Sequence, residues 1–188
     1  MANLDPWSYA SKTSSEHAEQ VALFMWANMA MRFGPNIAND PHSYNVKGFA
    51  LEQFKGKGGL GYIRYSEPLP QLKWLHAISN HGAGFGRKAE GVKKGVSDIF
   101  LPVPRYVGLV ASRLHGTQPC AVPETNQAFC GLYIELKRRD TANQKAGKPS
   151  PEQLEFQTDM RAAGYACALA YGWEQARDQI LRYLGLTA

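Results

Sequence analysis

The last third of the chain constrains the fold most, because it reads as strand, helix and strand in succession. Residues 129–138 and 165–171 are apolar runs that predict two strands. The helix between them is expected to start at Ser150, with Gln153 completing a capping box, and to end at Gly164. A strand–helix–strand unit implies two parallel strands joined by a right-handed crossover.

The remaining apolar runs add helices and strands to this unit. Residues 16–33 contain good helix formers and neither Pro nor Gly, and Thr13 and Glu16 have the spacing of a capping box. Residues 74–79 and 97–103 predict two short strands. A final helix carries an apolar face made of Trp173, Ala176, Ile180 and Leu184. The resulting order is helix, strand, strand, strand, helix, strand, helix, which predicts an α/β fold with a central mixed sheet flanked by helices.

Three segments lack such patterns. The first twelve residues read as a loose lead-in, and residues 34–70 and 105–128 as irregular insertions, the first with a short helix near 46–54. Long irregular segments in a compact domain are usually functional or mobile. A length of 188 residues suits a single domain, 1–188, that contains both insertions.

Composition excludes several classes of protein. Hydrophobic residues make up 44% of the chain, which excludes a wholly disordered protein. There is no apolar run long enough to span a membrane, and the first residues do not resemble a secretory signal. Three cysteines are too few for a disulfide framework and fit a reducing compartment. The spacing of His115, Cys120 and Cys130 is not that of a zinc finger, so free or structural thiols are expected.

Acidic and basic side chains alternate along the strongest strand. In residues 132–137, Leu132, Ile134 and Leu136 point to one face, and Tyr133, Glu135 and Lys137 to the other. Taken alone, Glu135 and Lys137 read as a solvated ion pair on an open sheet face.

Asp98 gives this pair a possible partner. It follows a basic, glycine-rich segment and opens an apolar strand, and an antiparallel pairing would place it beside Glu135. On its own, it also reads as a turn aspartate. Two adjacent carboxylates repel each other unless a proton or cation lies between them. Such oxygen ligands suit Mg²⁺ or Mn²⁺.

These segments resemble the VRR-NUC branch of the PD-(D/E)XK, or restriction endonuclease-like, superfamily. The resemblance lies in Gly91-Val-x-x-Gly-x-Ser-Asp98, Gly131-Leu-Tyr-Ile-Glu135-Leu-Lys137-Arg138, Ser150-Pro-Glu-Gln153 and Arg161-Ala-Ala-Gly164-Tyr. It extends from about residue 76 to the end, and Glu16-x-x-x-Gln20 with Trp26 is similar to the first helix of that family. Ser97 departs from the family, which usually has proline before the metal-binding Asp.

The resemblance implies roles for individual residues. Asp98, Glu135 and the backbone carbonyl of Leu136 would bind a catalytic Mg²⁺ or Mn²⁺. Lys137 would position or help to deprotonate the attacking water, and Gln153 would lie over the site from its helix. Glu16 would help to hold the metal or its waters, although it also fits a helix cap, and Glu19, one turn away, is the alternative.

Basic residues flank these acids along the chain and are expected to contact phosphates. They are Arg87, Lys88, Lys93, Lys94, Arg138, Arg139, Lys145 and Lys148. Ordinary surface charge is the simpler interpretation of each one alone; as a group they fit a nucleic-acid interface. The net charge of +5 permits a polyanionic partner without requiring one. Since no base-reading module is visible, recognition of nucleic-acid shape is expected.

The function expected from the resemblance is metal-dependent endonucleolytic hydrolysis of DNA, structure-selective for branched forms such as junctions or flaps. The alternatives are a catalytically silent DNA-binding or structural subunit on the same fold, and a nuclease that acts on RNA. Two-fold symmetric cutting of a junction would need a homodimer. A stand-alone protein of this type is expected in the cytoplasm of a bacterium or phage-infected host, without a membrane partner.

Overall fold

The structure is a computed structural model that describes residues 5–13, 15–45, 66–78, 93–107, 127–142 and 145–186. Its helices are α1 (Pro6–Thr13), α2 (Glu16–Phe33), α3 (Pro35–Ala38), η1 (Pro41–Asn45), η2 (Pro70–Trp74), α6 (Pro151–Ala162) and α7 (Trp173–Tyr183). Its strands are β1 (His76–Ala77), β2 (Ile99–Leu101), β3 (Arg105–Val107), β4 (Gln127–Phe129), β5 (Leu132–Lys137) and β6 (Ala166–Tyr171).

Four strands form one mixed sheet in the order β1-β2-β5-β6. Strands β5 and β6 are parallel, with α6 as the connection between them, so the predicted strand–helix–strand unit is confirmed. Strand β2 pairs with β5 in the antiparallel sense, with Ile99 opposite Ile134, and β1 pairs with β2 in the same sense. The predicted mixed α/β architecture is therefore correct.

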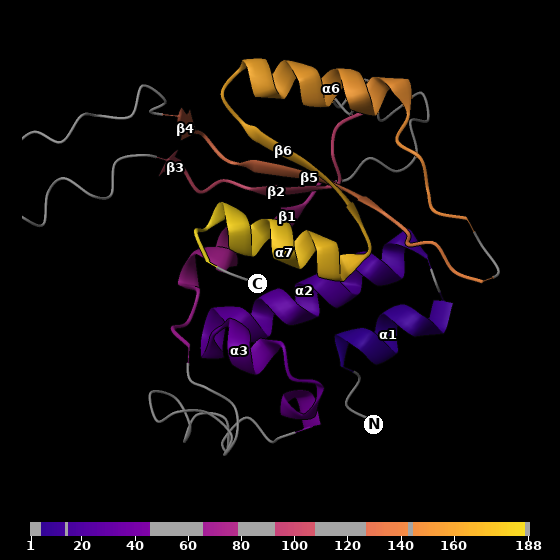
Figure 1. Ribbon diagram of the computed structural model, residues 1–188, viewed down its shortest axis with the longest axis vertical. Coiled ribbons are helices and arrows are strands. Elements are labelled where there is room, and N and C mark those ends of the chain that lie inside the picture. The colour runs from indigo at the N-terminus through magenta and orange to yellow at the C-terminus, as the bar shows by residue number, and fades with distance from the viewer. Residues whose placement is uncertain are drawn as a thin grey trace, which may run out of the picture.

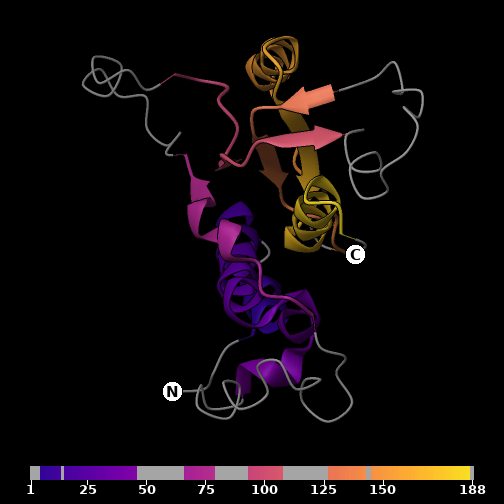
Figure 2. The same ribbon diagram turned by 90° about the vertical axis from the view of Figure 1, so that its left-hand side faces the viewer.

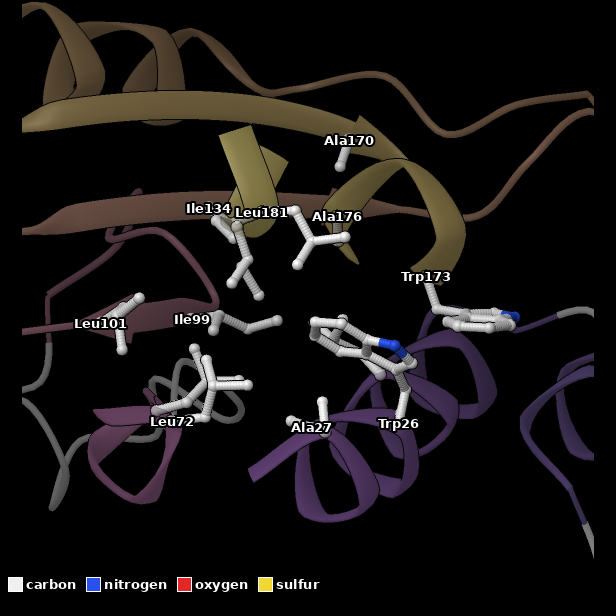
Figure 3. Close-up of a cluster of buried hydrophobic side chains, with 14 of the residues drawn as sticks. Trp26, Ala27, Leu72, Ile99, Leu101, Ile134, Ala170, Trp173, Ala176 and Leu181 are labelled. Atoms are coloured by element: carbon white, nitrogen blue, oxygen red, sulfur yellow. The ribbon is translucent and has the colours of Figure 1, made fainter. Parts of the chain in front are cut away.

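Helices cover both faces of this sheet (Figures 1 and 2). Helix α6 lies on one side, and α2 and α7 lie on the other. The main core forms between the sheet and the α2 and α7 helices, where Trp26, Ile99, Ile134 and Leu181 are completely buried (Figure 3). Because β5 lies inside the sheet and under helices on both faces, its polar residues are shielded as well as its apolar ones.

The predicted helix boundaries at α2 and α6 follow from local chemistry. Gly34 ends α2 with a φ of 85°, a left-handed conformation that favours glycine, and an added Cβ there would collide with the backbone carbonyl of Ser66. At α6, the Ser150 side chain accepts a hydrogen bond from the Gln153 N–H, and the Gln153 side chain accepts one from the Ser150 N–H. The predicted capping box at Ser150 is therefore present.

The start of the chain differs from the prediction. Residues 6–13 form helix α1 instead of a loose lead-in. Trp7 packs edge-on against Trp173, with ring centroids 4.9 Å apart, and its indole N–H donates to Glu174. These partners lie more than 160 positions away along the chain, so no local pattern could reveal them. Helix α2 is capped by Ser15, whose side chain accepts from the Ala18 N–H, and not by the predicted Thr13.

The insertions also contain more regular structure than predicted. Helix α3 and η1 follow α2 directly, and the outer ends of 105–128 pair as the antiparallel strands β3 and β4. Residues 70–74 form the helix η2, and in the described part of the predicted strand 74–79 only His76–Ala77 form a strand. The short helix expected near 46–54 lies outside the described residues. None of the helices in the described ranges combines the length and apolar character that crossing a bilayer requires.

Candidate active site

The pairing of β2 with β5 brings two carboxylates together. The register that places Ile99 opposite Ile134 sets Asp98 opposite Glu135, one step further along. Asp98 lies just before β2, where its side-chain oxygen accepts a hydrogen bond of 2.9 Å from the Leu136 N–H. The Asp98 side chain thus accepts a hydrogen bond that a backbone carbonyl would accept if the pairing of β2 with β5 continued. This bond fixes the Asp98 carboxylate beside β5.

Glu135 is fully buried and holds the centre of the site. Its Oε1 lies 2.7 Å from the Nζ of Lys137, two residues further along the same face of β5, and accepts a second hydrogen bond from the Gln153 side chain. Within the described part of the chain, its Oε2 has no hydrogen-bond partner. A buried carboxylate oxygen without a partner is costly unless a cation or a water binds it.

Gln153 performs two tasks with the two ends of one amide. Its oxygen accepts from the Ser150 N–H in the capping box, and its nitrogen donates to Glu135. Because the amide has separate donor and acceptor atoms, the cap and the site contact exist together. The first turn of α6 therefore anchors the Glu135 carboxylate.

The charges at the site perturb the acid–base properties of two side chains. Burial raises the pKa of Glu135 to about 7, and the charge of Asp98 adds to this, against the opposing hydrogen bond from Lys137. For Lys137, burial acts to lower the pKa, but its hydrogen bond to Glu135 and the charges of Glu135, Glu16 and Asp98 together raise it. Lys137 is therefore a cation held among carboxylates, and Glu135 is a carboxyl whose proton is easily replaced by a cation.

The structure separates the two glutamates of α2 that the sequence left open. Glu16 is half exposed, and its Oε1 lies 3.8 Å from the Lys137 Nζ, at the site. Glu19 faces elsewhere: it is 1% exposed, binds Arg139 at 2.7 Å, and accepts from the Trp173 N–H. Glu16 is thus the α2 carboxylate that belongs to the Asp98–Glu135 centre, and Glu19 is excluded from it.

A cavity of about 250 Å³ opens beside these residues. Its lining comes from the first turns of α2, the end of β1 and the edge of β5: Glu16, His17, Gln20, Ala77, Ile78, Asp98 and Leu136. The even-numbered residues of β5 direct their backbone groups toward β2, as the Leu136 N–H does. The Leu136 carbonyl therefore points to the same edge as the Asp98 carboxylate.

The donor atoms at this edge fit a hard divalent cation. No group of three or more His, Cys, Asp or Glu side chains in the described ranges is arranged to hold a metal ion. The edge offers instead the carboxylates of Asp98 and Glu135, the latter with its unpartnered Oε2, and the Leu136 carbonyl. This set suits Mg²⁺ or Mn²⁺, which bind one or two carboxylates and keep several waters. It does not suit a metal that needs a closed cage of side chains.

The basic residues divide into distinct groups. Lys93, Lys94, Lys145 and Lys148 are exposed, and Arg138 is half-buried with its Nε donating to the Lys145 carbonyl. Arg139 instead binds Glu19 through two nitrogens and Glu174 through a third. The structure thus gives Arg139 a structural role where the sequence indicated a phosphate contact. Arg87 and Lys88 lie outside the described residues, as do His115 and Cys120.

Two residues at the site were missed by the sequence reasoning. His17 lines the cavity, and its position next to Glu16 at the start of α2 was the available signal. Gly147 lies so close that an added Cβ would come within 2.8 Å of the Glu16 Oε1 and 3.1 Å of the Lys137 side chain. A lone glycine in a polar turn gives no indication of such a contact, because Glu16 lies more than 100 positions away in the sequence.

Comparisons with known proteins add a distant similarity. No family model matches the chain, and a search of curated proteins finds no match. A search of solved structures finds a protein described as "VRR_NUC domain protein", at 21% sequence identity and a TM-score of 0.43. The alignment covers 66% of this chain and 78% of that one. Neither a family nor an activity follows from similarity at this level.

Proposed function

We propose that this protein is a divalent-metal-dependent nuclease of the VRR-NUC type that hydrolyses phosphodiester bonds in DNA. The observation that carries the proposal is the buried Glu135, bound by Lys137 and Gln153, with an unpartnered oxygen next to Asp98. An ion pair with a purely structural role would need neither the Asp98 carboxylate nor a Glu135 Oε2 that lacks a hydrogen-bond partner. Branched DNA, such as junctions or flaps, is the proposed substrate.

The proposed site uses each side chain for one task. Asp98, Glu135 and the Leu136 carbonyl would hold Mg²⁺ or Mn²⁺, with Glu16 at the rim. When bound, such an ion polarises the scissile phosphate and lowers the pKa of a water molecule that attacks it. Lys137 favours the ionised form of Glu135 against the effect of burial and presents its ammonium to developing negative charge. Gln153 holds the Glu135 carboxylate in one orientation.

The test is cleavage of labelled DNA by the full chain in the presence of Mg²⁺ or Mn²⁺. Flap, junction, linear duplex, single-stranded DNA and RNA are compared. Glu135→Gln, Asp98→Asn and Lys137→Met each remove one role with little change in size, and we expect activity to fall at least about 100-fold, as for loss of a single catalytic group. Glu155→Gln, on the exposed side of α6, is the matched control and should leave the activity unchanged.

The alternatives are outcomes of the same experiment. Cleavage by Glu135→Gln at the wild-type rate would exclude this site. Salt-sensitive DNA binding without metal-dependent cutting of any substrate would indicate the silent DNA-binding or structural subunit. Faster cutting of RNA than of every DNA form would indicate the ribonuclease.

A further inference from the structure

One tryptophan of the described chain is turned to solvent. Trp74, at the end of η2, is 57% exposed, whereas Trp26 and Trp173 are completely buried and Trp7 packs against Trp173. Exposing most of an indole ring forfeits the stabilisation that its burial would give. The core therefore does not account for the position of Trp74.

A cationic side chain lies over this ring, and an exposed histidine contacts the backbone of the same residue. The Lys73 ammonium lies 4.8 Å from the centre of the Trp74 ring, over one face. His76 is exposed, and its Nδ1 is 2.9 Å from the Trp74 carbonyl. The His76 ring also stands edge-on to Phe100, which stacks on Tyr133 at 4.3 Å, so its position is fixed by the sheet.

The exposed ring is connected to the candidate active site by one short strand. Trp74 leads directly into β1, the outer strand of the sheet on the side away from β6 (Figure 2). Four residues later, Ile78 lines the active-site cavity, and its N–H donates to the Asp98 carbonyl at 2.7 Å. Four residues of extended chain span about 13 Å. A strand of nucleic acid in the cavity can therefore reach Trp74 along the edge of β1 that faces away from β2.

We infer that Trp74, with Lys73 and His76, binds an unpaired base of the nucleic-acid strand that occupies the active site. An indole ring offers a stacking surface for any base, and a neighbouring ammonium neutralises a phosphate. The bases of a duplex are already stacked on one another, so the surface selects single-stranded segments. This inference rests on the proposed function, which identifies the bound polymer as DNA. It deepens that proposal by assigning an unpaired segment to the substrate.

The test measures binding in EDTA, where no cleavage takes place. The full-length protein is titrated against a fluorescein-labelled oligothymidylate of about 12 nucleotides, within the range of known single-strand site sizes, and against a blunt duplex of similar length. We expect Trp74→Ala to weaken single-strand binding about tenfold or more, the effect of one base–aromatic contact. Trp74→Tyr should restore most of the affinity. Duplex binding should stay the same in all variants.

A matched control and an independent signal make the test specific. Leu154, on α6, is 50% exposed but aliphatic, so Leu154→Ala should bind both probes like the wild type. Tryptophan fluorescence of the wild type should be quenched by the oligothymidylate, and Trp74→Phe should lose most of that quenching. Since Trp74 is exposed, its variants should melt at the wild-type temperature.

Three results would overturn the inference. They are a wild type that does not bind the single strand, a Trp74→Ala variant that binds it unchanged, and an equal loss for single strand and duplex. Because binding is measured without a metal, a failure of the nuclease proposal in the cleavage assay is distinguishable from a failure here.

Discussion

Removing the Arg139 side chain should destabilise the fold, although the residue reads in the sequence as a surface phosphate contact. Its guanidinium binds Glu19 at 2.7 and 3.0 Å and Glu174 at 2.9 Å. Glu174 also accepts from the Trp7 indole, so Arg139 ties the end of β5 to α2, α7 and, through Glu174, α1. Among the described residues, Arg139→Ala would leave the buried Glu19 with the Trp173 N–H as its remaining donor.

The magnitude follows from the burial of the two partners. Breaking a fully buried ion pair costs about 3–5 kcal/mol, because an uncompensated charge remains. The Arg139 side chain is 38% exposed, so water reaches part of the vacated space and screens the charge. We therefore expect Arg139→Ala to lower the free energy of unfolding by about 2–3 kcal/mol. At about 2–4 °C per kcal/mol for a chain of this size, the melting temperature should fall by roughly 4–12 °C.

Urea denaturation followed by circular dichroism measures this change. Lys145→Ala, an exposed cation nearby, is the control and should change stability by less than about 0.5 kcal/mol. A double-mutant cycle with Glu19→Gln should give a coupling free energy of about 1–3 kcal/mol between the two side chains. A structural role for Arg139 is excluded if Arg139→Ala is as stable as Lys145→Ala, or if the coupling free energy is near zero.

Three further predictions follow from buried and closely packed groups. Without metal, the pKa of Glu135 is about 7 in the folded protein, against an ordinary value of 4.5. The free energy of unfolding of the wild type should therefore fall by up to about 3 kcal/mol relative to Glu135→Gln as the pH rises from 4.5 to about 7. Parallel curves of stability against pH for the two proteins would contradict this. Gly147→Ala should displace the Glu16 carboxylate and reduce metal-dependent cleavage by about tenfold or more, with little change in melting temperature. A second substitution, Glu16→Asp, shortens the displaced side chain and should restore part of the cleavage rate. Ile134→Ala should cost about 2–5 kcal/mol in urea unfolding, since the side chain is completely buried; a loss below about 1 kcal/mol would show that the core collapses around it.

Much of the candidate site could be predicted because its residues belong to short, regular segments. Period-two alternation places Glu135 and Lys137 on one face of β5, and the start signals of α6 place Gln153 at its N-terminus. Antiparallel pairing of two apolar strands is enough to bring Asp98 to Glu135. Each of these inferences needs only the geometry of one strand, one helix turn or one pair of strands.

What the sequence did not reveal depends on contacts between distant segments. The same alternation that groups Glu135 with Lys137 also predicts an open, solvated face. In the structure both side chains are buried, with Gln153 of α6 against Glu135 and with Glu16 and Gly147 against Lys137. Helix α1 packs against Trp173 and Glu174, and no pattern in the sequence near α1 predicts these contacts.

The order of the four sheet strands and of α2, α6 and α7, the parallel β5–β6 unit and the residue types at the site could be read from the sequence, because hydrophobic period and capping chemistry are local properties. The tertiary structure decided which of two glutamates on one helix turn faces Lys137 and which holds Arg139. Positions three apart on an α-helix point only about 60° away from each other around the helix axis, so small changes in how α2 lies against β5 would exchange their environments. That choice is made by the packing of the whole core, and it separates the proposed catalytic carboxylate from a structural one.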